Sequence, residues 1–125
     1  MGYEANIVNK LEIEYGNTIC GFRGLFYVFI DILNYVFKIS FWNENNCDGD
    51  YDSIFEIDNE EIEKLKLINI KEVNLIKAMD IIKKEEKDIT EEKAIKMLEN
   101  LKQSLIEALN TEFSRKNGRV RIEWF

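Results

Sequence analysis

The sequence has no histidine and no proline among its 125 residues. Without histidine, the chain lacks the usual general base near neutral pH, the commonest zinc ligand and the standard partner of a serine or cysteine nucleophile. A glycine-rich phosphate loop is also missing, because Gly21 and Gly24 are too few and wrongly spaced for one. We therefore expect a protein that is not an enzyme and that carries no cofactor and no metal.

Cysteines and long apolar runs are scarce as well. Two cysteines, Cys20 and Cys47, do not make a disulfide framework, and this fits thiols in a reducing compartment. The longest apolar stretch, residues 25–41, is interrupted by Asp31, Asn34 and Lys38, so it falls short of the roughly 20 apolar residues of a membrane span. The first 14 residues carry no secretory leader pattern. These features predict a cytoplasmic protein without membrane contact.

Hydrophobic residues make up 46% of the chain and are spread along its length, which predicts one folded domain over residues 1–125. Period-two alternation predicts strands over 3–15, 35–42 and 119–125, and the short apolar segment 53–57 is expected to be the returning strand of a hairpin. Gly16-Asn17 marks a turn after the first of them.

Helical spacing of apolar residues predicts a largely buried helix over 22–34, although its aromatic and β-branched residues also suit a hairpin. Further helices are expected after Asp58 as N-cap, over 71–84, and from Thr90 to a stop at Asn117-Gly118. The predicted fold is a single α+β domain in the order β-α-β-β-α-α-α-β. Its sheet is mostly antiparallel and four-stranded, with helices packed on one face.

The main charge feature is a window without any Lys or Arg that holds nine acidic residues: Glu44, Asp48, Asp50, Asp52, Glu56, Asp58, Glu60, Glu61 and Glu63. The whole chain has 24 acids and 17 bases, so the remainder holds 15 acids and 17 bases, and the formal charge is −9 inside the window and +2 outside. A local field of one sign attracts a basic partner. The competing interpretation is a solvated loop that leads into an acidic helix start.

Two further patterns have simple structural explanations. Asp48, Asp50 and Asp52 have the spacing of a calcium loop, but Ser53 stands where glycine is needed and Asn59 where a bidentate glutamate is expected. An acidic hairpin loop fits them better than a calcium or magnesium site. The basic residues Arg115, Lys116, Arg119 and Arg121 suit a helix end and a strand face, and the overall charge of −7 argues against direct binding of nucleic acid.

The leading hypothesis is a small acidic cytoplasmic protein that inhibits or neutralises a basic partner. An immunity protein against a nuclease toxin fits this description, as does a phage-encoded inhibitor of a host defence or nucleic-acid enzyme, because such enzymes have cationic grooves. The expected partner-binding residues are Trp42, Glu44, Asp48, Asp50, Tyr51, Asp52 and Glu56.

The alternative is a protein that binds or sequesters a small, nucleotide-like ligand, with a pocket that lies between subunits if the chain is oligomeric. For this function the expected ligand-binding residues are Arg119, Arg121 and Trp124, as anion contacts and a stacking surface. The sequence leaves the oligomeric state open.

Overall fold

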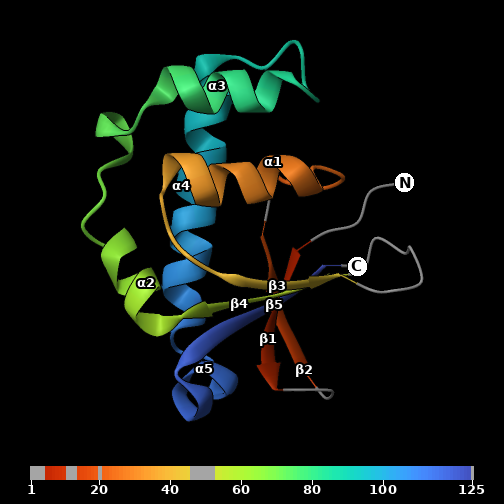
Figure 1. The fold of residues 1–125 in the computed structure, drawn as a ribbon, viewed down its shortest axis with the longest axis vertical. Coiled ribbons are helices and arrows are strands. Elements are labelled where there is room, and N and C mark those ends of the chain that lie inside the picture. Colours follow the sequence, from red (N-terminus) through yellow and green to blue (C-terminus); the bar gives the residue numbers. More distant parts are fainter. Residues whose placement is uncertain (1–4, 11–13, 20, 46–52, 125) are drawn as a thin grey trace.

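The computed structural model describes residues 5–10, 14–19, 21–45 and 53–124, and it shows a mixed α and β structure built on one sheet (Figure 1). In these ranges the sheet has five strands in the order β2-β1-β5-β4-β3. Their bounds are β1 Ala5–Lys10, β2 Glu14–Thr18, β3 Trp42–Asn45, β4 Ser53–Asp58 and β5 Arg119–Trp124. All neighbouring pairs are antiparallel, as predicted, but the predicted count of four strands is wrong.

The additional strand lies in the N-terminal segment. The alternation over 3–15 predicted one strand there, whereas the structure has two. Residues 5–10 and 14–18 pair with each other as β1 and β2, and the predicted turn at Gly16-Asn17 lies inside β2. From Asn6 to Val8 the chain advances two residues, whereas their partners, Thr18 and Tyr15, are three residues apart. One extra residue on one strand is a β-bulge, and a bulge explains a glycine within a strand.

The aromatic segment after residue 22 is helical, which confirms the helix prediction over its rival hairpin. The α-helix α1 spans Phe26–Asp31 and continues as a π-helix, η1, over Ile32–Val36. The strand predicted over 35–42 is wrong as far as residue 41: Tyr35 and Val36 belong to this π-helix, and residues 37–41 are in neither a helix nor a strand. Only Trp42 of the predicted segment lies in a strand.

Five more helical elements follow among the described residues. They are α2 Asn59–Leu65, the short 3-10 helix η2 Ile70–Glu72, α3 Leu75–Lys83, α4 Glu91–Ala108 and α5 Glu112–Asn117. The predicted long helix from Thr90 is divided into α4 and α5, because Thr111 starts a new helix by accepting a hydrogen bond from Ser114 N. The predicted stop is confirmed, since Gly118 follows α5 with a left-handed φ of 72°.

The main core lies between the helices and one face of the sheet. Alternation directs Phe55 and Ile57 of β4, and three side chains of β5, towards the helices. Trp124 is only 1% exposed and makes ring contacts with Phe26 and Phe29, with centroids 5.4 and 5.3 Å apart. These contacts attach α1 to the centre of the sheet.

The helices do not all lie on that face. In Figure 1, α1 and α3 lie above the sheet, whereas α5 lies below it, against β1 and β5. Val8, which alternates with the core residue Ile7, is buried, and so is Phe113 of α5, yet neither belongs to the main core cluster. Thus α5 departs from the predicted one-sided arrangement. None of the helices in the described ranges has the length and apolarity to span a membrane.

Candidate functional site

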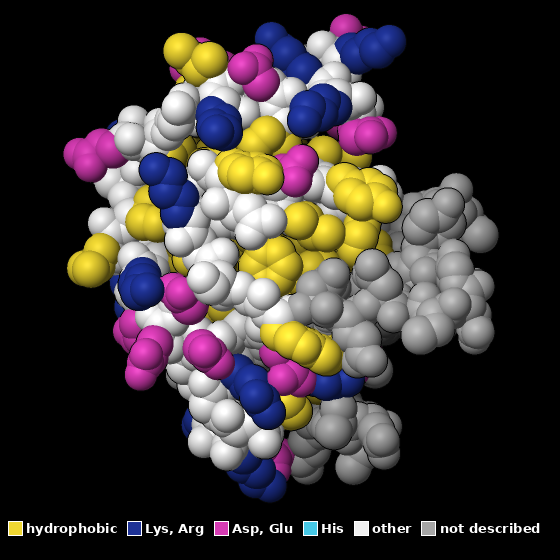
Figure 2. Space-filling model, viewed as in Figure 1, with side chains coloured by type: hydrophobic (Ala, Val, Ile, Leu, Met, Phe, Trp, Pro, Cys, Tyr) yellow, Lys and Arg dark blue, Asp and Glu magenta, His cyan; other side chains and the backbone are white. Residues whose placement is uncertain are grey.

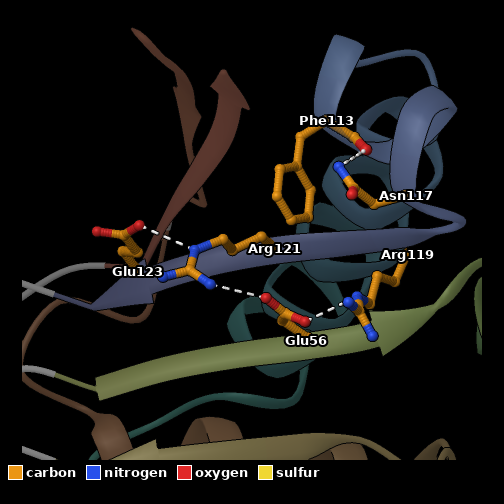
Figure 3. A network of polar contacts seen from close by, with 6 residues as sticks. All are labelled: Glu56, Phe113, Asn117, Arg119, Arg121 and Glu123. Carbon is orange, nitrogen blue, oxygen red and sulfur yellow. Dashed lines mark hydrogen bonds and ion pairs between the residues drawn. The ribbon is translucent and has the colours of Figure 1, made fainter. Parts of the chain in front are cut away.

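The face of β4 and β5 that points away from the main core carries a network of charged side chains (Figure 3). The Glu56 carboxylate lies between two guanidinium groups, with Arg119 Nε 2.8 Å from Oε1 and Arg121 Nη1 2.7 Å from Oε2. Arg121 also donates through Nε to Glu123 Oε2 over 3.0 Å. Opposite charges therefore alternate across the two strands.

This arrangement follows from the strand register. Phe55 and Ile57 point into the core, so Glu56 and Asp58 point to the other face. The β4–β5 ladder pairs Glu56 with Arg121 and Asp58 with Arg119. Opposite charges across an antiparallel pair are favourable, and long side chains also reach the diagonal neighbour, as Arg119 does to meet Glu56.

Most of this network is shielded from water. The side chains of Glu56 and Arg121 are 13% and 16% exposed. Burial lowers the pKa of Arg121, but its hydrogen bonds to Glu123 and Glu56 outweigh burial and raise that pKa above its ordinary value. The guanidinium group is therefore firmly charged, and Glu56 is held in one orientation.

A surface pocket of about 530 Å³ lies next to this network, within the 300–1,000 Å³ range that is typical of ligand sites. Its lining residues are Ser40, Phe41, Trp42, Glu56, Asp58 and Arg119. The Trp42 side chain is large and half exposed, at 50%. Trp42 pairs with Glu56 across the β3–β4 ladder, so the ring borders the charged network.

Asp58 differs from Glu56, because its side chain has no ion-pair partner among the described residues. It is exposed, and among the described residues no cation lies within ion-pairing distance of its carboxylate. It is the N-cap residue of α2, as predicted, but its side chain makes no cap hydrogen bond. The Asp58 carboxylate is therefore free to meet a group that enters the pocket.

A third carboxylate lies close to the pocket. Glu61 of α2 accepts a hydrogen bond from the backbone N of Ser40 over 3.4 Å and pairs with Lys64 Nζ at 2.9 Å. The hydrogen bond from Lys64 is the main cause that lowers the pKa of Glu61, against a smaller opposing effect of burial. Glu61 thus connects α2 to Ser40, two residues before β3, and Lys64 balances its charge.

Figure 2 shows the side of the molecule on which α1 lies in front. Hydrophobic side chains gather in the middle of this face, and acidic and basic side chains lie together below them. The large exposed hydrophobic residues of the described ranges include Tyr27, Tyr35 and Trp42. Aromatic surface of this kind, beside charged groups, is typical of a contact region for a partner.

The sequence hypotheses named two groups of site residues, and the structure brings members of both together. Trp42 and Glu56, expected to bind a partner, line the same pocket as Arg119, expected to bind a ligand, and Arg121 holds Glu56 in place. Trp124 lies in the core at 1% exposure and offers no stacking surface.

The remaining members of those groups are less informative. Glu44 pairs with Ile54 in the β3–β4 ladder. The other four residues, Asp48, Asp50, Tyr51 and Asp52, lie outside the described ranges. The described ranges contain no group of three His, Cys, Asp or Glu residues placed to hold a metal ion.

The structure also changes the interpretation of the acidic window. Three of its carboxylates are paired with cations from other parts of the sequence or the next helical turn: Glu56 with two arginines, Glu61 with Lys64, and Glu63 with Lys66 at 3.0 Å. Asp58, which the sequence presented as part of the acidic window and as a helix cap, is a charged pocket residue that was not among the predicted site residues. Its period-two spacing from Glu56 was the signal that could have identified it.

Comparisons with protein-family models, with curated proteins and with solved structures find no match to this chain.

Proposed function

We propose that this chain is a small binding protein that inhibits or neutralises a basic protein partner, and that it docks through the β3–β4 hairpin. The observation that carries the proposal is the pocket at one end of this hairpin. There the exposed ring of Trp42 lies with the carboxylate of Asp58, which pairs with no cation in the described part of the chain. The residues that connect the two strands include Asp48, Asp50 and Asp52. Acidic and aromatic residues therefore belong to one contiguous segment of the sequence.

An interface of this kind needs an anchor as well as a charge. Half-exposed tryptophan is among the residues that contribute most to binding energy at protein interfaces. Acidic residues around it raise the association rate with a cationic partner and disfavour acidic competitors. A nuclease or another enzyme that handles nucleic acid has the cationic groove that this surface complements. The chain would act as an immunity protein or as a phage-encoded inhibitor of such an enzyme.

The proposal assigns no catalysis to the pocket and places the protein in the cytoplasm. The pocket offers two carboxylates, a hydroxyl, two aromatic rings and a guanidinium group, and Arg119 uses its Nε to hold Glu56. These groups form a recognition surface whose lining has one more negative than positive charge. The cytoplasmic placement follows the cysteine usage of the sequence.

A direct test measures association between the chain and purified cationic nucleases, with nuclease activity as the second readout. We expect wild-type protein to bind and inhibit its target, and binding to slow as salt is raised from 0.1 M to 1 M, where the Debye length falls from about 10 Å to about 3 Å. Replacing Asp48, Asp50 and Asp52 together by Asn should slow association in the same way, and Trp42→Leu should mainly speed dissociation. Inhibition that survives all of these changes would remove the hairpin from the interface.

A second candidate function is supported by one observation, which is that Trp42 and Arg119 line the same pocket. A nucleotide-like ligand could stack its base on the Trp42 ring and direct an anionic group to the Arg119 guanidinium, which is 49% exposed. In the structure this pocket is formed within one chain. Calorimetric titration with nucleoside monophosphates separates the two functions, because Arg119→Met should abolish nucleotide binding while leaving the Asp58 carboxylate for a basic partner.

A further inference from the structure

We propose that the pocket between Trp42 and Asp58 is a receptor for a single arginine side chain of the partner. This inference rests on the proposed function and specifies the chemical group that is recognised. The pocket lining contains two carboxylates, Glu56 and Asp58, and one guanidinium, Arg119, so its formal charge is −2 + 1 = −1. A monocation is the guest that balances this charge.

In the neighbouring network around Glu56, the cations that pair with carboxylates of β4 are guanidinium groups. Glu56 already holds two guanidinium groups of the chain itself, one on each carboxylate oxygen, at 2.8 and 2.7 Å. Asp58 occupies the next outward-facing position of β4, two residues further along, and its own oxygens have no such partner among the described residues. A third guanidinium on Asp58 would extend the same pattern of alternating charges.

The ring of Trp42 makes the pocket selective for a flat cation. Trp42 is the cross-strand partner of Glu56, so Asp58 is its diagonal neighbour, and diagonal neighbours in a sheet lie about 7–8 Å apart, within reach of aromatic side chains. A guanidinium can lie flat on an indole face and still donate two hydrogen bonds in its plane to a carboxylate. An ammonium group is compact and strongly hydrated, and it lacks this combination.

The test uses N-acetyl-arginine amide, whose capped ends leave the side chain as the only charge, and the isotope-labelled chain observed by NMR. The protein has two tryptophans, and they provide an internal control. The indole N–H signal of Trp42, which is 50% exposed, should shift saturably during the titration, while that of Trp124, which is 1% exposed, should stay in place. N-acetyl-lysine amide should bind more weakly, and the neutral isostere N-acetyl-citrulline amide should not bind.

The matched variants are Asp58→Asn and Glu60→Gln. Both remove one negative charge from an exposed residue, but Glu60 lies in α2 and does not line the pocket. Asn is as good a helix cap as Asp, so Asp58→Asn should keep the fold. We expect Asp58→Asn to weaken binding of N-acetyl-arginine amide about tenfold or more, and Glu60→Gln to change it less than twofold.

Three results would overturn the inference: equal shifts with the arginine and citrulline amides, equal effects of the two variants, or shifts of both tryptophans together. If the arginine amide fails to bind while a cationic nuclease is still bound and inhibited, the partner enters by another route and the proposed function remains. If neither binds, both proposals fail.

Discussion

The buried hydroxyl of Ser114 in α5 donates a hydrogen bond to Asn59 Oδ1, at the first residue of α2, over 2.8 Å. Asn59 returns a bond through Nδ2 to the Ser114 carbonyl at 3.3 Å, and its backbone N donates to the Gly118 carbonyl at 3.0 Å. These bonds join the residue after β4 to Ser114 of α5 and to Gly118, the residue before β5. They therefore support the end of the sheet at which Asp58 and Arg119 meet.

We expect Ser114→Ala to destabilise the protein by about 1–3 kcal/mol, because it leaves a part-buried Asn59 oxygen without its donor. Urea denaturation followed by circular dichroism measures the change. Ser104→Ala in α4 is the control, and it should stay within about 0.5 kcal/mol. Equal losses in the two variants would show that the Ser114–Asn59 bond has no special contribution.

Glu56→Gln should destabilise the protein by about 1–3 kcal/mol, since it leaves the shielded guanidinium of Arg121 without one of its two carboxylates. The appropriate measurement is a double-mutant cycle with Arg121→Met, monitored by denaturant unfolding. We expect a coupling energy of about 0.5–3 kcal/mol. A coupling energy of zero would mean that the network is only a surface arrangement of charges.

Leu101→Ala should cost about 2–5 kcal/mol, because Leu101 is fully buried in the core under α4. Its neighbour Lys102 donates through Nζ to the Ile68 carbonyl, so Lys102→Met should cost about 0.5–1.5 kcal/mol through loss of one hydrogen bond. Thermal unfolding of both variants checks the order of the two effects. A larger loss for Lys102→Met would contradict the assigned face of α4.

The ion pair between Glu61 and Lys64 should make the stability of the fold depend on pH in the acidic range. The pKa of Glu61 is lowered from its usual 4.5 in the folded state, so its pairing with Lys64 stabilises the protein above that pH, and the stabilisation disappears as pH falls through the folded-state pKa. We expect the difference in melting temperature between wild type and Glu61→Gln to be positive at pH 7 and to shrink at pH values below 4.5. Glu60→Gln, in the same helical turn, is the control. A wild-type advantage that is the same at pH 7 and pH 3 would show that the pair is not responsible.

Deletion of Arg119–Phe125 should abolish folding, because β5 is the central strand and pairs with both β1 and β4. The deletion removes three buried side chains, Val120, Ile122 and Trp124, each worth about 1.5–3 kcal/mol, from a domain whose stability is about 5–15 kcal/mol. The measurement is the thermal transition of the truncated protein. A soluble truncation that melts at the wild-type temperature would contradict the observed topology.

Elements with a clear period or a distinct capping residue could be predicted from the sequence. The strand at β5, the helix start after Thr90 and the stop at Gly118 all have such signals, and the structure confirms them. The break between α4 and α5 was missed because the apolar stripe continues across it, and only the side-chain bond of Thr111 shows the new start.

The segment after α1 could not be predicted, because its signals conflict. Buried residues occur at 32, 33, 36 and 37, which suits a helix, and then at 39, which suits an extended chain. After the π-helix the chain passes through Lys38, which has a left-handed φ of 55°. Glycine is the residue that usually adopts this conformation. With no glycine at this position, the end of the helix has no sequence signal.

Several residues of the candidate site could be predicted from the sequence, but their grouping into one site could not. Trp42 and Glu56 were named because of local charge and aromaticity, and Arg119 and Arg121 because of a separate basic cluster. Glu56 and Arg121 are 65 positions apart in the sequence, and only the β4–β5 register brings them into contact. Counting charges along the sequence cannot show that Glu56, inside the acidic window, is neutralised by Arg119 and Arg121, which lie outside it.

The strand order β2-β1-β5-β4-β3 also has a consequence for the protein as it is being made. The hairpins β1–β2 and β3–β4 are both complete before β5 exists, and no described strand pairing joins them until residues 119–124 have been synthesised. Until then β1 and β4 each present one open row of backbone donors and acceptors, which invites pairing with other chains. A nascent or stalled chain is therefore expected to depend on chaperones. Once β5 has formed, it pairs with β1 and β4, and both strands then lie inside the sheet.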